Sequence, residues 1–345
     1  MTDSDWWHPA RHADRRPLLL ARNRIQKGLR AWLDDEGFTE VDPAALVASP
    51  GNEAHLHAFE TRLLDTEGRG ETRYLHTSPE FAMKKLIAAG ERRIAAFAHV
   101  WRNREGGPRH AAEFTMLEWY RCGADYAVLM GDVAAMARIA ARAAGVAVLR
   151  HGDATCDPFA PFERLSVADA FARLAGIDLA ATLAPDGAPD AAALRAQMRA
   201  TGLRPGDGDT WSAMFSHVLV ARIEAHLGHG RLTVLDRYPA AEAALARRCP
   251  DDARFSERFE VYACGVELAN GFGELTDPVE QRARFEAEMD EKARVYGTRY
   301  PLDEALLAAL PLMPPTAGIA LGFDRLVMLA TGAPRVDLVQ WAPAG

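Results

Sequence analysis

The sequence lacks several features that would each have pointed to a particular class of protein. Its four cysteines, Cys122, Cys156, Cys249 and Cys264, are scattered and form no CxxC pair, so neither a zinc knuckle nor a disulfide framework is indicated. No uncharged apolar stretch is long enough to span a bilayer. The first residues, Met1 to Trp7, have neither the basic start nor the apolar run of a signal peptide. We therefore expect a cytoplasmic protein without a membrane partner.

The sequence also lacks a strongly basic block and internal repeats. Its formal net charge is −8 at pH 7, with 40 Lys and Arg against 48 Asp and Glu. Proteins that hold nucleic acid through its phosphates usually present a basic face, so this balance disfavours a tRNA partner. The 345 residues, 49% of them hydrophobic, are sufficient for one large catalytic domain or two small ones.

The spacing of apolar residues, Gly and Pro predicts an α+β fold. Ile25, Leu29 and Leu33 recur at helical spacing after Pro17, and Gly37 ends that helix. The further elements that we expect, in chain order, are a strand at Phe38–Val41, a helix opened by Ser78-Pro79-Glu80, strands at Ile94–Arg102 and Glu113–Arg121, a helix within 125–149, a helix at Trp211–Leu227, a strand at Leu232–Leu235, two strands within Phe259–Leu275 around a Cys264-Gly265 turn, and a strand at Gly318–Leu321 that leads into a helix at Asp324–Leu329. This order fits a mainly antiparallel sheet flanked by helices, not alternating βαβ units.

The domain boundaries follow from changes in composition. Residues 1–16 are expected to be an N-terminal tail and residues 17–345 the catalytic domain. The region at about 150–250 contains Gly, Pro and Asp runs at Pro185–Pro189 and Pro205–Asp209. Candidate catalytic residues occur both before and after this region, so we interpret it as an insertion within the domain.

The strand at Glu113–Arg121 has polar and aromatic side chains on one face. Successive side chains alternate between the faces of a strand, so Phe114, Met116, Glu118 and Tyr120 point the same way. An aromatic ring, a carboxylate and a phenol on one side of a sheet would form the floor of a pocket for a flat ring and an amine. Taken alone, the pattern fits better an ordinary half-buried strand whose glutamate faces solvent.

Two groups of cations stand where anions bind well. Arg102 ends the first strand of the pair, and the following loop adds Arg104, Arg109 and His110. Arg325 stands in the first turn of a helix, where a cation opposes the helix dipole unless an anion is present. Both groups suit phosphate binding. A solvated loop and a surface ion pair are the competing interpretations.

Glu260, Glu267 and Glu274 are spaced by sevens. If the chain turns near Cys264, Glu260 and Glu267 lie nearly opposite each other on paired strands, where two like charges destabilise a sheet. A divalent cation between them would reverse that penalty, and Mg²⁺ prefers carboxylate and phosphate oxygens. The pattern therefore favours a Mg²⁺ site over two solvated carboxylates.

Together these segments resemble the catalytic core of class II aminoacyl-tRNA synthetases of the lysyl type. The resemblance covers about residues 17 to 332. The run Gly37-Phe38-Thr39-Glu40-Val41-Asp42-Pro43 is similar to the first class motif, and Arg102 through Tyr120 is similar to the second. The run Gly318-Ile319-Ala320-Leu321-Gly322-Phe323-Asp324-Arg325 is similar to the third. The lysyl-type signature is Glu267-Leu268-Ala269-Asn270-Gly271-Phe272-Gly273-Glu274. The nearest likeness is to a family of truncated lysyl-tRNA synthetase paralogues that attach β-lysine to a lysine of translation elongation factor P.

The resemblance implies a role for each matching residue. The catalytic residues would be Arg102, Arg325 and Glu267. The residues that would contact ATP are Arg102, Asn103, Arg104, Glu105, His110, Ala111, Phe114, Glu267, Leu268, Gly322 and Arg325. The residues that would contact the amino acid are Ser78, Pro79, Glu80, Glu118, Tyr120, Asn270, Glu274 and Ala320. Glu260 and Glu267 would hold Mg²⁺.

The match has two departures and two informative agreements. The family has Glu where Arg104 stands, and Glu105, one position on, is a candidate replacement. The family has Asn-Pro where this chain has Ala111-Ala112, so Ala111 would reach a nucleotide only through its backbone. Ser78 and Ala320 stand where true lysyl-tRNA synthetases carry Ala and Gly, and they favour the β-lysine ligases.

The resemblance finally implies partners. No anticodon-binding domain is recognised before the first helix, so we expect no anticodon recognition of tRNA. The expected enzyme uses ATP and Mg²⁺, activates lysine or β-lysine as an adenylate, and transfers it to elongation factor P. The first motif implies a homodimer. A stand-alone lysyl-tRNA synthetase-like enzyme and a catalytically silent binding module are the alternatives.

Overall fold

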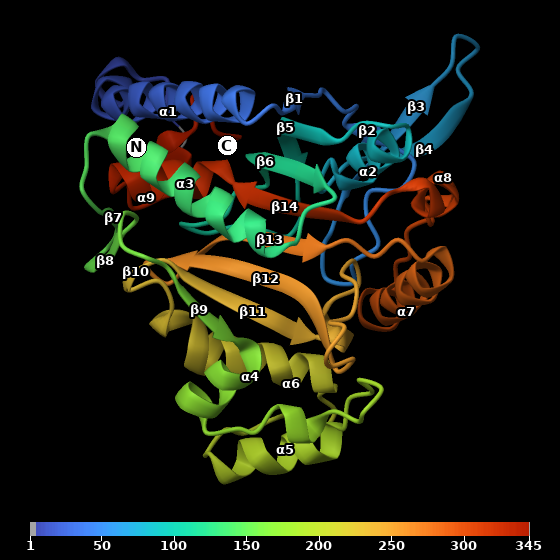
Figure 1. Cartoon of the computed structure of the whole chain (residues 1–345). Helices are drawn as coiled ribbons and strands as arrows, with labels where there is room; N and C mark the ends of the chain where they lie inside the picture. Colours follow the sequence, from blue (N-terminus) through green and yellow to red (C-terminus); the bar gives the residue numbers. More distant parts are fainter. Residues whose placement is uncertain (1–4, 345) are drawn as a thin grey trace.

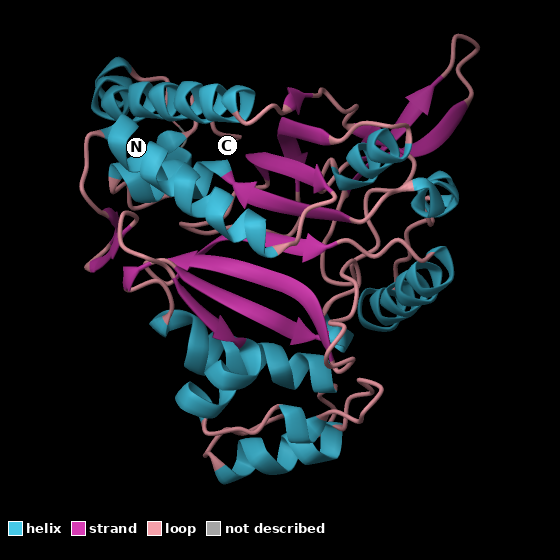
Figure 2. Ribbon diagram, viewed as in Figure 1, coloured by secondary structure: helices cyan, strands magenta, loops and turns pink. Residues whose placement is uncertain are grey.

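An eight-stranded sheet forms the centre of the computed structural model, which describes residues 5–344 (Figures 1 and 2). Its strands, in spatial order, are β1 (Thr39–Glu40), β5 (Arg93–Trp101), β6 (Glu113–Cys122), β14 (Thr316–Gly322), β13 (Val266–Gly273), β12 (Phe255–Ala263), β11 (Thr233–Pro239) and β9 (Glu163–Ser166). The β1–β5 and β9–β11 pairs are parallel, and every pair between them is antiparallel. The predicted α+β fold with a mainly antiparallel sheet is confirmed.

Helices cover the two faces of this sheet unequally. On one face lie α1 (Pro9–Asp35), α3 (Ala127–Ala144) and α9 (Phe323–Thr331), which share one apolar core with sheet residues such as Leu117 and Trp119. On the other face α2 (Glu80–Ala88), α7 (Pro278–Tyr296) and α8 (Glu304–Ala309) pack around Ile94 and Tyr120 near one end of the strands. The rest of that second face is left available for a cavity.

The alternation of side chains along β6 explains how one strand serves both faces. Leu117 and Trp119 are fully buried among the helices α1, α3 and α9. Their neighbours Met116, Glu118 and Tyr120 point to the opposite face, as a period of two requires. The apolar half of the strand thus anchors the sheet, and the polar half becomes the lining of the cavity described below.

The first helix begins earlier than the sequence predicted. It runs from Pro9 with Pro17 inside it, so residues 9–16 belong to the fold and are not a tail. The buried Arg15 explains the extension, because its guanidinium donates to the backbone carbonyls of Asp337 and Leu338, at 3.1 and 3.4 Å. These tertiary contacts outweigh the hydrogen bond that Pro17 removes from the helix interior.

The predicted insertion at about 150–250 is too wide. Its β9 and β11 are strands of the central sheet, since β11 pairs with both β9 and β12. The added part lies between them and contains α4 (Val167–Ala170), α5 (Ala191–Ala200) and α6 (Trp211–Val218), which build a second apolar core against β11 and β12 at the bottom of Figure 1. The short β9 gives too weak a period-two pattern to be recognised in the sequence.

Shorter elements complete the chain. A three-stranded sheet joins β10 (Gly230–Arg231), β8 (Ala154–Asp157) and β7 (Leu149–His151), and another joins β2 (Leu46–Val47), β4 (Gly70–Leu75) and β3 (Phe59–Leu64). The β3–β4 hairpin projects from the body of the molecule (Figure 1). The predicted helix at Trp211–Leu227 is continuous in the structure, where a π-helical turn (Leu219–Ile223) and a 3-10 turn (Glu224–His226) extend α6.

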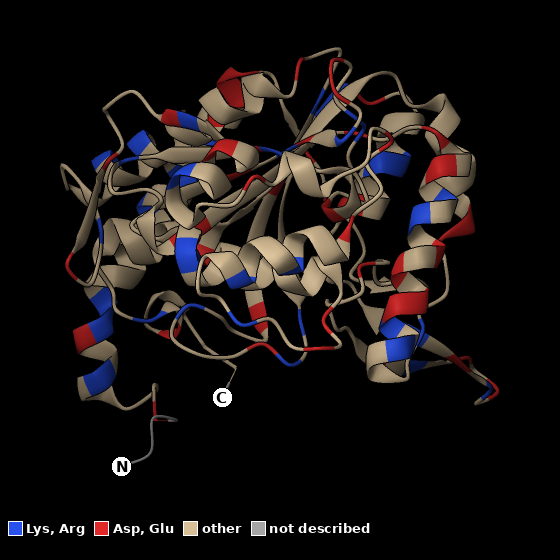
Figure 3. Ribbon diagram, turned by 90° about the horizontal axis from the view of Figure 1, so that it is seen from below, with Lys and Arg blue, Asp and Glu red and all other residues tan. Residues whose placement is uncertain are grey.

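Charged residues of both signs are interspersed over the ribbon, as the view in Figure 3 shows. Helix α7 is an example, since Glu280 pairs with Arg284 and Glu291 pairs with Arg294 along its length. None of the helices between residues 5 and 344 has the length and apolar character needed to cross a bilayer.

Candidate active site

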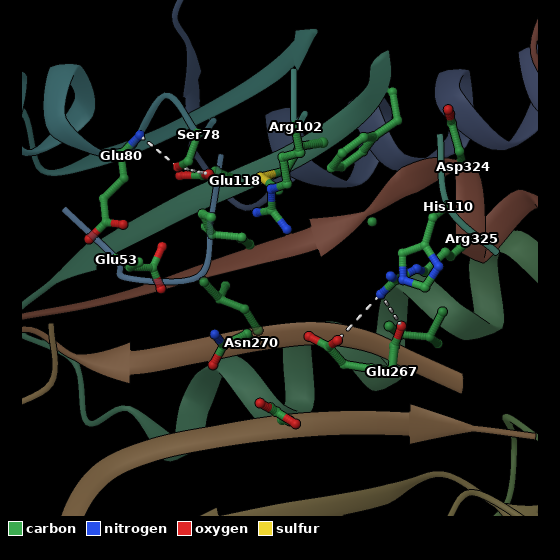
Figure 4. Close-up of a pocket in the computed structure, with 18 of the residues that line it drawn as sticks. Glu53, Ser78, Glu80, Arg102, His110, Glu118, Glu267, Asn270, Asp324 and Arg325 are labelled. Atoms are coloured by element: carbon green, nitrogen blue, oxygen red, sulfur yellow. Dashed lines mark hydrogen bonds and ion pairs between the residues drawn. The ribbon is translucent and has the colours of Figure 1, made fainter. Parts of the chain in front are cut away.

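A cavity of about 250 Å³ opens on the face of the sheet opposite α1, α3 and α9 (Figure 4). Strands β6, β13 and β14 form its floor, and the loop between β5 and β6 and the start of α2 supply its sides. Most of the predicted site residues line it, namely Ser78, Glu80, Arg102, Glu105, His110, Ala111, Phe114, Glu118, Tyr120, Glu260, Glu267, Leu268, Asn270, Ala320, Gly322 and Arg325. The segments from which they come lie far apart in the sequence.

The carboxylate of Glu118 lies at one end of this floor. Ser78 donates a hydrogen bond from Oγ to Glu118 Oε1 at 2.5 Å, and the phenol of Tyr120 lies 3.3 Å from Oε2. Burial, and then the nearby charge of Glu80, raise the pKa of Glu118 to about 8, while the Ser78 hydrogen bond opposes the shift. Such a carboxyl becomes fully ionised near neutral pH only when a cation binds beside it.

Glu80 and Glu274 share a cation at the same end of the cavity. Lys84 Nζ lies 2.5 Å from Glu80 Oε1 and 2.6 Å from Glu274 Oε2, and its side chain is 1% exposed. Burial alone would lower the pKa of Lys84, but the charges of Glu274 and Glu80 outweigh it and raise that pKa. Lys84 is therefore a permanent ammonium group within this carboxylate cluster.

Glu274 was predicted to contact the amino acid, and the structure places it on the cavity face of the sheet, buried beside Gly318 and outside the set of residues that line the cavity. Its carboxylate fills the space that a side chain at Gly318 would occupy, since a Cβ atom there would come within 2.2 Å of Glu274 Oε1 and 2.3 Å of Tyr120 Cε1. Oε1 is buried and has no hydrogen-bond partner among the described residues. Burial raises the pKa of Glu274, and the ion pair with Lys84 opposes that shift. Because Gly318 has no side chain, this oxygen fits beside it on the same face of the sheet as Tyr120.

The opposite end of the cavity is cationic at Arg325, and Arg102 lies between the two ends (Figure 4). Arg325 Nη1 lies 3.3 Å from Glu267 Oε2 and donates to the backbone carbonyl of Glu267 at 3.1 Å. Arg102 stacks over the ring of Phe114, with 5.4 Å between the guanidinium carbon and the ring centroid. Burial, and then Arg325, Arg109 and Arg102, lower the pKa of His110 to about 4, so this imidazole is neutral near pH 7. Two guanidiniums beside a neutral ring suit the phosphates of a nucleotide.

The start of α9 is fixed by a buried network around Asp324. Arg22 of α1 forms an ion pair with Asp324 and donates to Thr115 Oγ1 at 2.8 Å. Gln340 donates to Asp324 Oδ2 at 2.8 Å. Because Arg325 follows Asp324 directly, this network fixes the direction in which the Arg325 guanidinium enters the cavity.

Glu260 and Glu267 are offset from each other and not directly opposite. Glu260 faces Asn270 and Tyr262 faces Glu267, because a register shift between Val261 and Tyr262 displaces the strands. Glu260 accepts hydrogen bonds from Arg258 and Tyr262, each at 2.6 Å, whereas Glu267 contacts Arg325 and is more exposed. Both carboxylates still line the cavity. Within residues 5–344, no group of three or more His, Cys, Asp or Glu is placed to hold a metal by itself.

The remaining predicted residues lie outside the cavity. Pro79 caps α2, and the backbone of Asn103 pairs with His57. Arg104 has a positive φ of 64°, which turns its side chain towards the ring of Tyr296, 5.4 Å from the centroid. Glu105 occupies the cavity wall in its place and lies 3.9 Å from Arg102 Nη1. The structure therefore gives Pro79, Asn103 and Arg104 no side-chain contact with the cavity.

Three residues of this region were missed in the sequence. Lys84 stands four positions after Glu80, on the same helix face, and that spacing could have indicated it. Arg258 stands two positions before Glu260, on the same strand face. Glu53 also lines the cavity (Figure 4). It lies in a loop whose apolar residues follow no helical or strand spacing, so no local sequence pattern indicates it.

Comparison with known proteins agrees with this arrangement. The family model of class II tRNA synthetases (D, K and N) matches residues 5–344. A Vibrio cholerae protein named elongation factor P–(R)-beta-lysine ligase is 35% identical over 356 residues, which cover 99% of each chain. Proteins of the same name from Klebsiella pneumoniae and Salmonella arizonae are 36% and 37% identical, with 98% and 97% of each chain covered.

Proposed function

The chain belongs to the family of class II tRNA synthetases (D, K and N), and we propose that it is an ATP-dependent ligase that attaches (R)-β-lysine to elongation factor P. The near-complete coverage of relatives that bear this name supports the proposal. The main observation in support of the proposal is the way in which positive and negative charges are distributed along the cavity. Arg325 stands at one end, the carboxylates of Glu80 and Glu118 stand at the other, and Arg102 lies between them, so one cavity suits both a nucleotide and a diamino acid (Figure 4).

In the first step, a carboxylate oxygen of the amino acid attacks the α-phosphorus of ATP. A new O–P bond forms, the bond to the bridging oxygen breaks, and pyrophosphate leaves. Arg102 and Arg325 stabilise the negative charge that develops on the phosphate oxygens, without having to reorganise during the reaction. Phe114 supplies an aromatic face for the adenine. No side-chain nucleophile is needed, since positioning and charge stabilisation supply the rate.

The amine end selects the amino acid. Glu118, with Ser78 and Tyr120 fixing its oxygens, receives one ammonium group, and Glu80 faces the same space. A buried carboxylate without its cation is costly, so a substrate that lacks an amine leaves an uncompensated charge and binds weakly. This cost distinguishes a diamino acid from a neutral isostere.

In the second step, the side-chain amine of the acceptor lysine attacks the acyl carbon of the adenylate. The C–N bond of an amide forms, the C–O bond to phosphate breaks, AMP leaves, and the amine loses a proton. Elongation factor P is the proposed acceptor because the relatives' name states it. The lysine isomer and the acceptor lysine are open to direct measurement.

Mg²⁺ fits the carboxylates of the cationic end. Glu267 and Glu260 line the cavity, and their oxygens, together with nucleotide phosphates, form the kind of ligand set that Mg²⁺ prefers. When bound, the ion would neutralise phosphate charge. Glu267 would be the more available ligand, because Glu260 already accepts from Arg258 and Tyr262.

Incubation of elongation factor P with the protein, ATP and each lysine isomer, followed by mass spectrometry, tests the proposal. We expect a mass gain of one lysyl residue with (R)-β-lysine and a smaller yield with α-lysine. Pyrophosphate exchange that fails with every diamino acid would instead support a silent binding module. Charging of tRNA faster than transfer to protein would support a lysyl-tRNA synthetase-like enzyme.

A homodimer and a cytoplasmic location complete the proposal. The homodimer rests on the likeness of Gly37–Pro43 to the first class motif, and light scattering tests it. The cytoplasmic location rests on the proposed substrates, ATP and a translation factor, and cell fractionation tests it.

A further inference from the structure

Lys84 lies at the amine end, and neither the family likeness nor the proposed chemistry gives it a role. It projects from α2 into a space enclosed by the sheet, where its residue is 0% exposed. It contacts Glu80 from its own helix and Glu274 from the chain just after β13. A fully buried ammonium is stable only when it is paired, and here it is paired with two carboxylates at once.

The charges at this end of the cavity can be counted. Glu80, Glu118 and Glu274 contribute three negative charges when ionised, and Lys84 contributes one positive charge. The remainder is two negative charges, which equals the charge of the two ammonium groups of a diamino acid. Glu53 also lines the cavity, where burial and then the charge of Glu80 raise its pKa, while Arg102 and Arg258 oppose that shift. Because the raised pKa favours its uncharged form, and because Lys84 does not contact it, Glu53 is left out of the count.

Lys84 also decides which carboxylate oxygens remain free. It contacts Oε1 of Glu80 and Oε2 of Glu274, so one oxygen of each carboxylate is engaged. The other oxygen of Glu274 is buried without a hydrogen-bond partner in the described part of the chain, beside Gly318 on the cavity face of the sheet. An unpartnered carboxylate oxygen so close to the cavity floor fits a substrate ammonium group that comes to lie against Gly318.

We propose that Lys84 is a positioning and specificity-determining residue: its two ion pairs hold the carboxylates of Glu80 and Glu274 in place, and its charge sets the net charge of the amine end to match a diamino acid. The inference rests on the proposed function, since it concerns selection of the same substrate. Without Lys84, one of the three carboxylates would be protonated in the empty cavity and would lose that proton when the two substrate ammonium groups bind.

The test compares Lys84→Met with the wild type in ATP–pyrophosphate exchange and in calorimetric titration with (R)-β-lysine. We expect the KM for the diamino acid to rise about 30-fold, as for loss of a charge-assisted contact, and the KM for ATP to change less than about threefold. Calorimetry in buffers of different ionisation enthalpy should show that about one more proton is released on binding than with the wild type. A loss of packing alone would not change the number of protons released.

The matched control is Lys85→Met, the next residue of the same helix, which pairs with Asp303 at 2.7 Å and does not line the cavity. We expect its KM for the diamino acid to stay within about twofold of the wild-type value. Equal effects of the two substitutions would overturn the proposal.

A double variant keeps the proposal testable if Lys84→Met folds poorly. Lys84→Met/Glu80→Gln removes one charge of each sign and restores the count of two negative charges. We expect it to recover about tenfold in kcat/KM relative to Lys84→Met, whereas purely structural losses would add. Additive losses in the double variant would contradict the Lys84 proposal, and so would a wild-type KM and a wild-type number of released protons in Lys84→Met. The proposed function would stand in either case, provided that the wild type catalyses exchange with β-lysine. Failure of the wild type to bind any diamino acid would overturn both.

Discussion

Ser78 donates its hydroxyl proton to Glu118 across 2.5 Å, from the residue that precedes the cap of α2 to the middle of β6. The same hydroxyl accepts from the backbone amide of Glu80 at 3.0 Å. One small side chain thus joins two carboxylate-bearing segments and fixes their separation at the amine end. The protonation state of Glu118 should therefore differ between the empty cavity and the cavity that holds a substrate ammonium group, and the pH dependence of binding measures this difference.

The affinity for the diamino acid should rise with pH through neutrality. The pKa of Glu118 is raised from 4.5 to about 8, mainly by burial, so the neutral form stabilises the empty fold below pH 4.5 and that stability is lost as pH rises towards 8. The bound ammonium requires the ionised form, so the KM should fall by up to about tenfold per pH unit between pH 6 and 8. Exchange assays at pH 6, 7 and 8 measure this slope. Glu118→Gln should abolish it, and a flat wild-type profile would refute the assignment.

Ala320 should influence the choice between lysine isomers. It pairs with Glu118 in the β14–β6 ladder and lines the floor of the cavity beside that carboxylate. Ala320→Gly removes a methyl group where the amine of the substrate must turn towards Glu118. We expect the ratio of kcat/KM for α-lysine to that for β-lysine to rise about tenfold, the value of one methylene in a pocket. Exchange assays with both isomers measure the ratio, and an unchanged ratio would exclude Ala320 as a selector.

Gly318 should tolerate no side chain. A Cβ atom there would lie 2.2 Å from Glu274 Oε1 and 2.3 Å from Tyr120 Cε1, and both side chains are held in place by burial. Gly318→Ala should therefore destabilise the fold by about 2 kcal/mol and raise the KM for the diamino acid. Gly131→Ala in α3 is the control, because its added Cβ meets no atom within 4 Å. Thermal denaturation and exchange assays report the two effects, and a wild-type KM in Gly318→Ala would show that the floor adjusts freely.

The sequence predicted the residues of the cavity well where they follow one periodic element. The face of β6 that carries Phe114, Glu118 and Tyr120 follows from a period of two, and the turn near Cys264 places β12 beside β13 as expected. The offset of Glu260 from Glu267 could not be predicted, because a register shift inside the strand changes which residues face each other.

Features that depend on distant contacts were the ones missed. Helix α1 continues through Pro17 because Arg15 binds the backbone near the C-terminus, and no local pattern encodes that contact. The Gly and Pro runs near 185–209 marked the helical addition, but β9 was missed, and the predicted strand at Leu232–Leu235, which is β11, was assigned to the insertion and not to the central sheet. Glu274 matches the family signature, yet only the structure reveals that Lys84 stands against it.

Arg325 should be essential for adenylate formation. Its guanidinium reaches the cavity from the first turn of α9 and contacts Glu267. Arg325→Met should lower kcat/KM in exchange by about 1,000-fold, since it removes charge stabilisation at the phosphates. Arg282→Ala, which breaks an exposed pair with Glu304, is the control and should keep wild-type activity. Activity within a few fold of the wild type in Arg325→Met would remove this residue from the mechanism.

Glu267 and Glu260 should respond differently to loss of their charge, because only one of them is already committed to protein contacts. Glu267→Gln leaves the fold intact and should raise the Mg²⁺ concentration needed for half-maximal exchange about tenfold, as for the loss of one hard oxygen ligand. Glu260→Gln also weakens the contacts with Arg258 and Tyr262, both made at 2.6 Å, and should lower the melting temperature as well. Magnesium titration of the exchange reaction and thermal denaturation of both variants separate the two effects. An unchanged Mg²⁺ requirement in Glu267→Gln would mean that the ion is held by the nucleotide alone, and equal melting temperatures would mean that the Arg258 contact adds little to the fold.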